Sequence, residues 1–156
     1  MTSITPFLWY DDQAEHAEHA AEHYVSLFPD SRIDSVAKTP DGQTLVVEFT
    51  LLGRPYRAMN GGPGHEHSDA VSFQVDVDTQ EELDRIWDAL LADGGRPSMC
   101  GWLFDRWGVA WQVTPSMMGE LMTGSGDPEA NARVFQAMMQ MSKLDIPALR
   151  AAAAGR

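Results

Sequence analysis

The sequence contains little cysteine and little positive charge. Cys100 is its one cysteine, so neither a disulfide within the chain nor a zinc site made of several cysteines can form. A single free thiol is typical of a reducing compartment, and we expect a cytoplasmic protein. Lysine and arginine number 11 against 23 aspartates and glutamates, which gives a formal net charge of −12. This field repels phosphate backbones and anionic lipids, so we expect neither nucleic acid nor a membrane as a partner.

Long hydrophobic runs and targeting features are also missing. The apolar runs extend over only a few residues, whereas a transmembrane helix needs about 20. Residues 1–10 carry no lysine or arginine and are followed by Asp11 and Asp12, so we expect no signal peptide. The composition, 44% hydrophobic and 22% charged, predicts a single globular domain over residues 1–156.

A pattern of one strand, one helix and three strands occurs twice along the chain. The first module covers residues 3–62, with a helix predicted over 13–28 and strands over 4–10, 32–38, 44–52 and 55–60. The second module covers residues 69–118, with a helix predicted over 79–93 and strands over 70–78, 96–100, 102–105 and 109–114. These two βαβββ modules predict an α+β fold.

The two modules also share weak sequence similarity. Residues 53–59 align with 108–114, because each segment begins with a turn glycine and has an aromatic residue three positions later. Residues 8–12 align loosely with 73–78. The chain then continues into a C-terminal helical tail over 127–154, which begins at Asp127 and which Pro147 interrupts. This tail packs either on its own domain or on a partner.

Several short motifs occur in the order found in one protein family. They are the segments 4–10, 24–31, 59–63, 72–75, 100–108 and 110–113. Over about residues 3–150 the chain resembles the PhnB-like, or demethylubiquinone methyltransferase-like, branch of the vicinal oxygen chelate superfamily, which includes glyoxalases and bleomycin resistance proteins. The resemblance implies a curved mixed eight-stranded sheet around a cavity, and a homodimer.

The resemblance also implies where metal-using members of the superfamily would hold a divalent ion. Two of these positions lie near the start of each module's first strand, near Thr5 and Ala70, and two lie four residues after a turn glycine, at Arg57 and Gln112. Arginine and alanine cannot ligate a metal, and threonine and glutamine are weak ligands. We therefore expect no bound metal. No cofactor is predicted either, because the glycine-rich segment 61–64 leads into a strand and not into a nucleotide-binding helix.

Alternation along the strands predicts which side chains line the cavity. The predicted ligand-binding residues are Phe7, Trp9, Glu48, Arg57, Met59, Ser72, Gln74, Gln112 and Thr114. If the protein is an enzyme, Arg57 would anchor an anion, and Gln74 and Gln112 would donate hydrogen bonds to the substrate. The alternative is that these are ordinary core residues, with Glu48 neutralising Arg57.

Other reactive residues favour structural interpretations over functional ones. Cys100 is interpreted as a small buried residue, because no histidine lies near it in the sequence to activate a thiolate. Asp105 is expected to form the turn before Gly108. Residues 65–67 contain two histidines and are expected to form a flexible connector, with a role over the cavity mouth as the alternative.

One helical face carries His16, His19 and His23, a spacing that can hold zinc. Glutamates interleave with these histidines, so we expect a solvated, charged face.

The function that follows is binding, or binding and transforming, a small organic molecule in a metal-independent pocket. The first alternative is a non-catalytic sequestering protein of the resistance type, and the second is a metal-dependent isomerase or dioxygenase. An enzyme should contain an ionisable group of shifted pKa in the pocket, whereas a sequestering protein need not.

Overall fold

The computed structural model describes residues 2–11, 16–124 and 126–156. The chain divides into two compact units, Met1–Glu66 and His67–Arg156, and the boundary falls in the loop expected between the two modules. No helix in the described part of the chain has the length and hydrophobicity required to span a bilayer.

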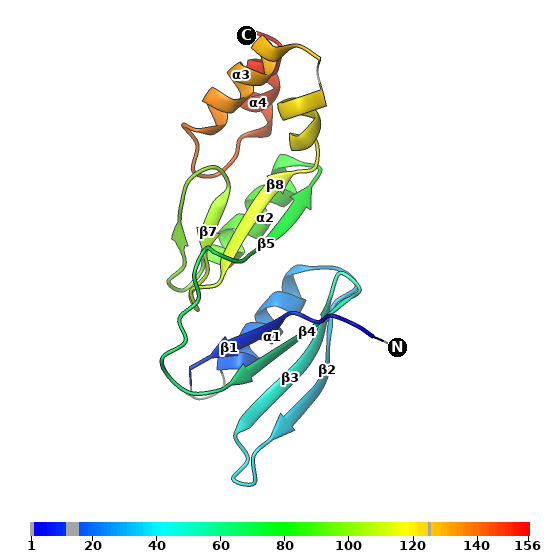
Figure 1. Cartoon of the computed structure of the whole chain (residues 1–156), viewed down its shortest axis with the longest axis vertical. Coiled ribbons are helices and arrows are strands. Elements are labelled where there is room, and N and C mark those ends of the chain that lie inside the picture. The colour runs from blue at the N-terminus through cyan, green and yellow to red at the C-terminus, as the bar shows by residue number, and fades with distance from the viewer. Residues whose placement is uncertain (1, 12–15, 125) are drawn as a thin grey trace. The chain divides into compact units, whose positions relative to one another are not determined.

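The first unit is a four-stranded mixed sheet with one helix on it (Figure 1). Its elements are β1 (Phe7–Tyr10), α1 (His16–Leu27), β2 (Arg32–Lys38), β3 (Thr44–Leu51) and β4 (Arg54–Asn60). The strand order is β1-β4-β3-β2, with β1 parallel to β4 and the other pairs antiparallel. The predicted helix over 13–28 is confirmed from His16, because residues 12–15 lie outside the described residues.

The second unit repeats this arrangement and adds the tail. Its sheet has the order β5-β8-β7-β6, with β5 parallel to β8. The elements are β5 (Ser72–Val77), α2 (Gln80–Leu91), β6 (Arg96–Pro97), β7 (Trp102–Phe104) and β8 (Ala110–Pro115). The Thr79 side chain accepts a hydrogen bond from the Glu82 amide at the start of α2, within the helix predicted over 79–93. The eight strands thus form two mixed sheets of four, and the α+β prediction is confirmed.

The predicted strand over 96–100 is wrong beyond Pro97. Cys100 and Gly101 both have positive φ, +58° and +84°, and the Trp102 amide donates to the Met99 carbonyl 3.0 Å away. Two successive residues of positive φ make a tight hairpin turn, which ends the extended backbone. The turn places Cys100 at the tip of the β6–β7 hairpin.

Each sheet buries one face against its helix. In the first unit the buried strand residues Val47, Phe49 and Ala58 lie on the side of α1. In the second unit α2 buries Leu83, Ile86, Trp87 and Leu90, and the sheet buries Val75, Val77, Trp111 and Val113. Because side chains alternate along a strand, the intervening residues point to the opposite face of each sheet.

The C-terminal tail forms more elements than the sequence predicts. A short π-helix, η1 (Glu120–Gly124), precedes α3 (Pro128–Met138) and α4 (Ile146–Ala153). Pro147 does not interrupt a helix, as the sequence suggests, but lies in the first turn of α4, which Asp145 caps by accepting a hydrogen bond from the Ala148 amide 2.8 Å away. A proline is tolerated there because the first turn of a helix has no intrahelical acceptor for its N–H.

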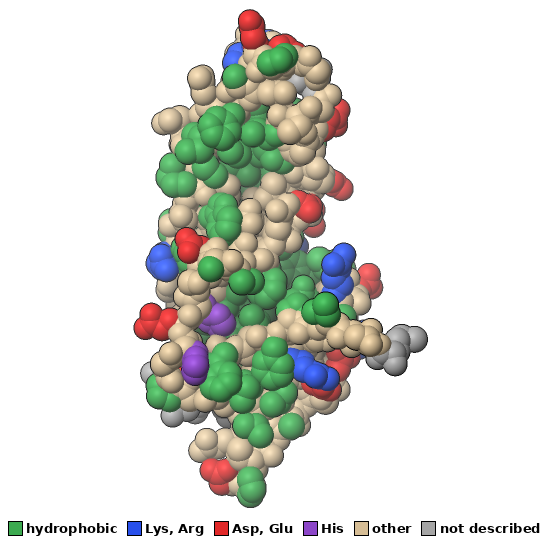
Figure 2. Space-filling view, in the orientation of Figure 1, with side chains coloured by type: hydrophobic (Ala, Val, Ile, Leu, Met, Phe, Trp, Pro, Cys, Tyr) green, Lys and Arg blue, Asp and Glu red, His purple; other side chains and the backbone are tan. Residues whose placement is uncertain are grey.

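The tail packs on its own unit, which decides between the two alternatives left open by the sequence. The Cys100 and Gly101 amides donate to the Met141 and Ser142 carbonyls, at 2.8 and 2.7 Å. The Gln80 side chain accepts from the Ile146 amide at 2.8 Å and donates to the Leu144 carbonyl at 3.1 Å. Figure 2 shows hydrophobic side chains gathered over the tail, and Phe135 and Met139 are among the exposed ones.

Lowering the pH is expected to weaken the attachment of the tail to α2. The Lys143 ammonium, 2.9 Å from Asp84, and then Gln80 hold the pKa of the Asp84 carboxyl below its ordinary value of 3.8. A carboxyl with a lowered folded-state pKa adds stability above its unfolded value, and this stability is lost as the pH falls through the folded value. The two side chains are 42% and 37% exposed, so the contribution is under about 1 kcal/mol.

The measurement is the unfolding free energy of the protein as a function of acid pH. Asp84→Asn should remove this contribution, whereas Asp88→Asn, a 72% exposed residue 3.7 Å from Lys143, should remove less of it. An acid dependence in Asp84→Asn equal to that of the unsubstituted protein would contradict the assignment.

Candidate functional site

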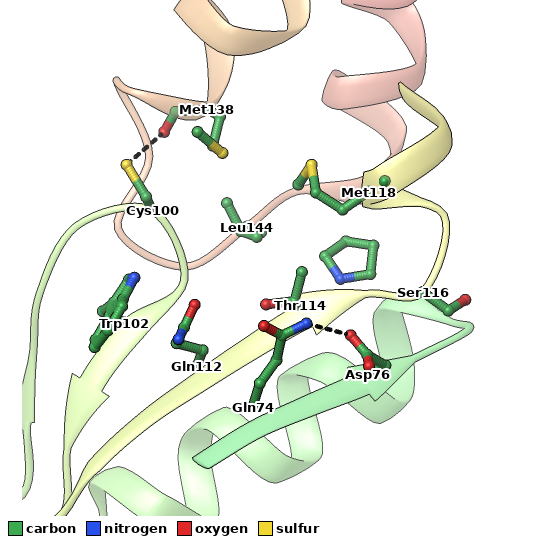
Figure 3. Close-up of a pocket in the computed structure, with 12 residues that line it drawn as sticks. Gln74, Asp76, Cys100, Trp102, Gln112, Thr114, Ser116, Met118, Met138 and Leu144 are labelled. Carbon is green, nitrogen blue, oxygen red and sulfur yellow. Dashed lines mark hydrogen bonds between the residues drawn. The ribbon is translucent and has the colours of Figure 1, made fainter. Parts of the chain in front are cut away.

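The second unit contains a pocket of about 520 Å³ between its sheet and its tail. Its floor consists of side chains from β5, β7 and β8, which point away from α2 (Figure 3). Its other side comes from the β6–β7 turn, the segment after β8, and the tail. The lining residues are Gln74, Asp76, Cys100, Trp102, Gln112, Thr114, Pro115, Ser116, Met118, Gly119, Met138 and Leu144.

Strand register places the polar floor residues beside one another. Gln112 lies opposite Gln74 on one side and opposite Trp102 on the other, so these three residues form one row across the sheet. Asp76 lies opposite Thr114 in the next row. Pairs in register on one face have side chains within contact reach, and the pocket floor is therefore continuous.

Hydrogen bonds orient both glutamine amides of the floor. The Gln74 Nε2 atom donates to Asp76 Oδ1 at 2.8 Å, and the Gln112 Nε2 atom donates to Ser72 Oγ at 2.9 Å. Each side-chain amide carries its donors on nitrogen and its acceptor on oxygen. Because each nitrogen gives one of its two N–H groups to a neighbouring residue, each amide offers a bound molecule its carbonyl oxygen and one remaining N–H.

The roof of the pocket is apolar and rich in sulfur. Leu144 is 1% exposed and is packed against Gly101, while Met118 and Met138 are half-buried at the pocket wall. The Cys100 Sγ atom lies 3.6 Å from the Met138 carbonyl and 3.6 Å from Met139 Sδ. Methionine adapts its shape to irregular surfaces, so this roof can fit ligands of different outline.

Three of the predicted ligand-binding residues, Gln74, Gln112 and Thr114, are brought together in this pocket. Ser72 holds Gln112 without lining the pocket. The five others lie in the first unit, on the face of its sheet opposite α1: Phe7, Trp9, Glu48, Arg57 and Met59.

Three of the first-unit residues, Trp9, Glu48 and Arg57, make local polar or aromatic contacts. Arg57 forms an ion pair with Glu48 through Nε and Nη2, each 2.8 Å from Oε1, with the two side chains 49% and 43% exposed. Trp9 donates its indole N–H to the Gly62 carbonyl at 2.9 Å, and its ring centroid lies 4.7 Å from that of His65. Phe7 is half exposed. Arg57 is thus paired with Glu48, as the alternative interpretation expects, but these residues are too exposed to belong to a core.

Strand register shows how the two modules correspond near the positions at which the resemblance implies a metal. Phe7 pairs with Arg57 across β1 and β4, and Gln74 pairs with Gln112 across β5 and β8, so the two modules correspond through these pairs. In this register, Thr5 of the first module corresponds to Ser72 of the second. The sequence alone matches Thr5 with Ala70, which lies two residues earlier. Phenylalanine has no donor atom and the Arg57 guanidinium is cationic, so neither can ligate a metal.

Elsewhere in the described residues, no three or more His, Cys, Asp or Glu side chains come together in a way that could hold a metal. His16 lies 2.9 Å from Asp11, and His19 is exposed on the same helix.

Two other interpretations from the sequence can be compared with the structure. Asp105 forms the expected turn, because its Oδ1 atom accepts from the Trp107 and Val109 amides at 2.9 and 3.0 Å. Cys100 is not a buried core residue, as the sequence suggests, but is half-buried at the pocket wall. Its positive φ in a hairpin turn explains the difference, since the turn holds it at the surface of the sheet.

Sequence reasoning missed several residues of the pocket. Asp76, Trp102, Met118, Met138 and Leu144 were not predicted to line it. The alternation that selects Gln74 also selects Asp76, so this residue could have been found. The tail residues could not, because no pattern in the sequence shows on which surface a tail will pack.

One family model matches the chain, over residues 2–114, and its description is 3-demethylubiquinone-9 3-methyltransferase. The match ends at residue 114, one residue before the end of β8, so the tail lies outside it. No curated protein matches the sequence.

Solved structures similar to this chain share its fold. A PhnB protein from Bacillus cereus is 30% identical, covers 74% of this chain and 100% of its own, and has a TM-score of 0.66. A protein from Pseudomonas aeruginosa is 21% identical, with 74% and 98% covered and a TM-score of 0.54. The fosfomycin resistance protein FosX from Listeria monocytogenes, in complex with manganese(II) and 1S,2S-dihydroxypropylphosphonic acid, is 11% identical, with 77% and 97% covered and a TM-score of 0.56.

Proposed function

The chain belongs to the 3-demethylubiquinone-9 3-methyltransferase family, a PhnB-like branch of the vicinal oxygen chelate superfamily, and we propose that it binds a small organic molecule in the pocket of its second unit without a metal. The observation that carries this proposal is the pocket itself, with its amide, hydroxyl and carboxylate floor and its apolar roof. Pockets of 300–1,000 Å³ with a few oriented polar groups are the usual sites of small ligands.

Metal independence is supported by the chemistry of the residues at the family's metal positions. Of the positions that the resemblance implies, Ala70 cannot ligate, Thr5 and Gln112 are weak ligands, and the Arg57 guanidinium is paired with Glu48. Gln74 and Gln112 offer only neutral amide oxygens. FosX holds manganese(II) together with its phosphonic acid. In the present chain we propose that hydrogen bonds from the floor replace such a metal in orienting the ligand.

A sequestering role is favoured over catalysis by the ionisable groups of the pocket. Among its described lining residues the carboxyl of Asp76 and the thiol of Cys100 lie on opposite sides, on the floor and at the wall below the tail (Figure 3). General acid–base catalysis needs a proton donor or acceptor within hydrogen-bond reach of the reacting group, and paired groups divide the two roles. Methyl transfer, which the family description names, would in addition need a site for a methyl donor, and the glycine-rich segment after β4 leads into a loop and then β5.

The experiment is native mass spectrometry of untagged protein purified without nickel or chelator, repeated under denaturing conditions. We expect an organic adduct of defined mass that is released on denaturation, with no stoichiometric metal.

The same spectrum reports the oligomeric state, for which we propose a homodimer. A cytoplasmic location is proposed from the single free cysteine.

Gly119→Trp tests whether the adduct occupies this pocket. Gly119 lines the pocket, no atom lies within 4 Å of a Cβ placed on it, and its φ is not positive, so a side chain can be added without backbone strain. The indole should fill the pocket and abolish the adduct, whereas Gly119→Ala should retain it. One stoichiometric metal per chain, or an adduct that survives in Gly119→Trp, would contradict the proposal.

A further inference from the structure

The floor of the pocket carries a negative charge, whereas a site for an anion carries a positive one. Asp76 is the only aspartate, glutamate, lysine or arginine among the described lining residues. Its Oδ1 atom accepts from the neutral Gln74 amide, and no basic side chain in the described ranges forms a salt bridge with it. A carboxylate without a cationic partner repels anions and attracts cations, and the net charge of −12 acts in the same direction.

The groups around Asp76 offer several hydrogen-bond acceptors. A carboxylate can only accept, so the bond from Gln74 to Asp76 must use the amide nitrogen, and it leaves Gln74 Oε1 as an acceptor. Thr114 lies opposite Asp76 in register, and its hydroxyl can accept as well. An ammonium group has three donors and no acceptor. The second carboxylate oxygen, the Gln74 carbonyl and the Thr114 hydroxyl therefore match its donors in number and type.

The other end of the floor suits an apolar group. Trp102 lies on β7, two strands away from Asp76 on β5, and one row further along the sheet. With standard strand spacing and rise, the two Cα atoms are about 12 Å apart. Figure 3 shows Trp102, Gln112, Gln74 and Asp76 in sequence across the floor, with Met138, Leu144 and Met118 on the side of the tail. An aromatic or aliphatic body between the indole and the thioethers gains both apolar burial and sulfur–aromatic contact.

We propose that the ligand of this pocket is a small organic cation: an ammonium group on Asp76, carried by an apolar body that reaches Trp102. This inference rests on the proposed binding function and adds the chemical class of the ligand to it. It replaces the anion anchor expected from the sequence, because the Arg57 guanidinium is already paired with Glu48.

The test compares three probes of one shape that differ in the charge of one end: 4-phenylbutylamine, 4-phenylbutan-1-ol and 4-phenylbutanoate. Their affinities for the full-length protein are measured by isothermal titration calorimetry near neutral pH and at low salt. Asp76 is exposed, so we expect the amine to bind up to about fivefold more tightly than the alcohol, as for a surface ion pair, and the carboxylate to bind most weakly. Added salt should reduce the preference for the amine, because it screens the charge of Asp76.

Asp76→Asn should lower the affinity for the amine much more than the affinity for the alcohol, and so remove the preference for the amine. Glu81→Gln is the matched control, since it removes the same charge from an exposed position on α2, on the other side of the sheet, and should keep the preference. Retention of the wild-type preference in Asp76→Asn would overturn the proposal.

The binding data distinguish a ligand of another chemical class from a pocket that binds no ligand. Equal binding of the amine and the alcohol, lost in Gly119→Trp, would overturn the cation assignment and leave the binding function intact. A tighter carboxylate would have the same consequence. The absence of binding by all three probes, together with native mass spectra free of an adduct, would overturn both.

Discussion

Replacement of Asp105 by alanine is expected to lower the free energy of unfolding of the second unit by about 3–5 kcal/mol, the largest effect of any single substitution considered for this chain. The Asp105 side chain is 3% exposed and closes the turn between β7 and β8. Besides the Trp107 and Val109 amides bonded to Oδ1, the Trp111 indole N–H donates to Oδ2 at 2.9 Å. Alanine leaves these donors without their acceptor, and a buried unsatisfied donor costs about 1–3 kcal/mol.

Denaturant unfolding followed by tryptophan fluorescence measures this change. Asp105→Asn keeps one oxygen acceptor but places an amide nitrogen against a backbone or indole N–H donor. We therefore expect an intermediate loss of about 1–2 kcal/mol in the free energy of unfolding. Asp93→Asn is the control, because Asp93 is 73% exposed and forms only a surface ion pair with Arg106, worth under about 1 kcal/mol. A loss of under 1 kcal/mol in Asp105→Ala would show that the turn does not depend on this carboxylate.

Leu144→Ala is expected to destabilise the same unit by about 2–5 kcal/mol and to detach the tail from the sheet. Leu144 is 1% exposed, and a Cβ placed on Gly101 would lie 2.9 Å from its Cδ1 atom, so the leucine is packed directly on the backbone of the β6–β7 turn. Truncation removes apolar contacts and leaves a cavity next to the pocket. Leu144→Met, which nearly conserves volume, should lose less than about 1.5 kcal/mol.

Hydrogen exchange distinguishes release of the tail from general destabilisation. The Cys100 and Gly101 amides donate to tail carbonyls, so their protection depends on docking of the tail. We expect these two amides to exchange faster in Leu144→Ala, with strand amides of β5 and β8 remaining protected. Equal acceleration at all of these amides would contradict a local role for Leu144.

The two βαβββ modules could be predicted from the sequence because each element has a strong local pattern. The capping residue Thr79 and the apolar stripe of α2 define that helix, and the alternation of Val47, Phe49 and Leu51 defines β3. Local signals failed at Met99–Gly101, where a hairpin turn replaces the end of the predicted strand. There the positive φ of Cys100 is imposed by the turn, and nothing about cysteine predicts it.

The candidate site was predictable only in part, for a similar reason. Strand parity follows from the alternation of buried and exposed residues, so Gln74, Gln112 and Thr114 were assigned to one face of the sheet by sequence alone. Their roles were not, since the direction of each amide depends on Asp76 and Ser72 beside it. The expected anion site at Arg57 likewise depended on whether Glu48 would pair with it, and the register of β3 and β4 places them opposite each other.

The sequence by itself determined the family, the order of the strands and helices, and the excess of negative charge. It also determined which strand residues share a face of the sheet. All of these depend on local composition and spacing. Only the tertiary structure decided that the tail packs on its own unit, that Met138 and Leu144 complete the pocket, and that Asp76 lies beside the glutamines of its floor. These features arise from contacts between residues such as Cys100 and Met141, or Gln80 and Ile146. Such contacts join segments that are distant in the sequence. The surface on which the tail packs depends on both segments together, so the sequence of either segment alone does not predict it.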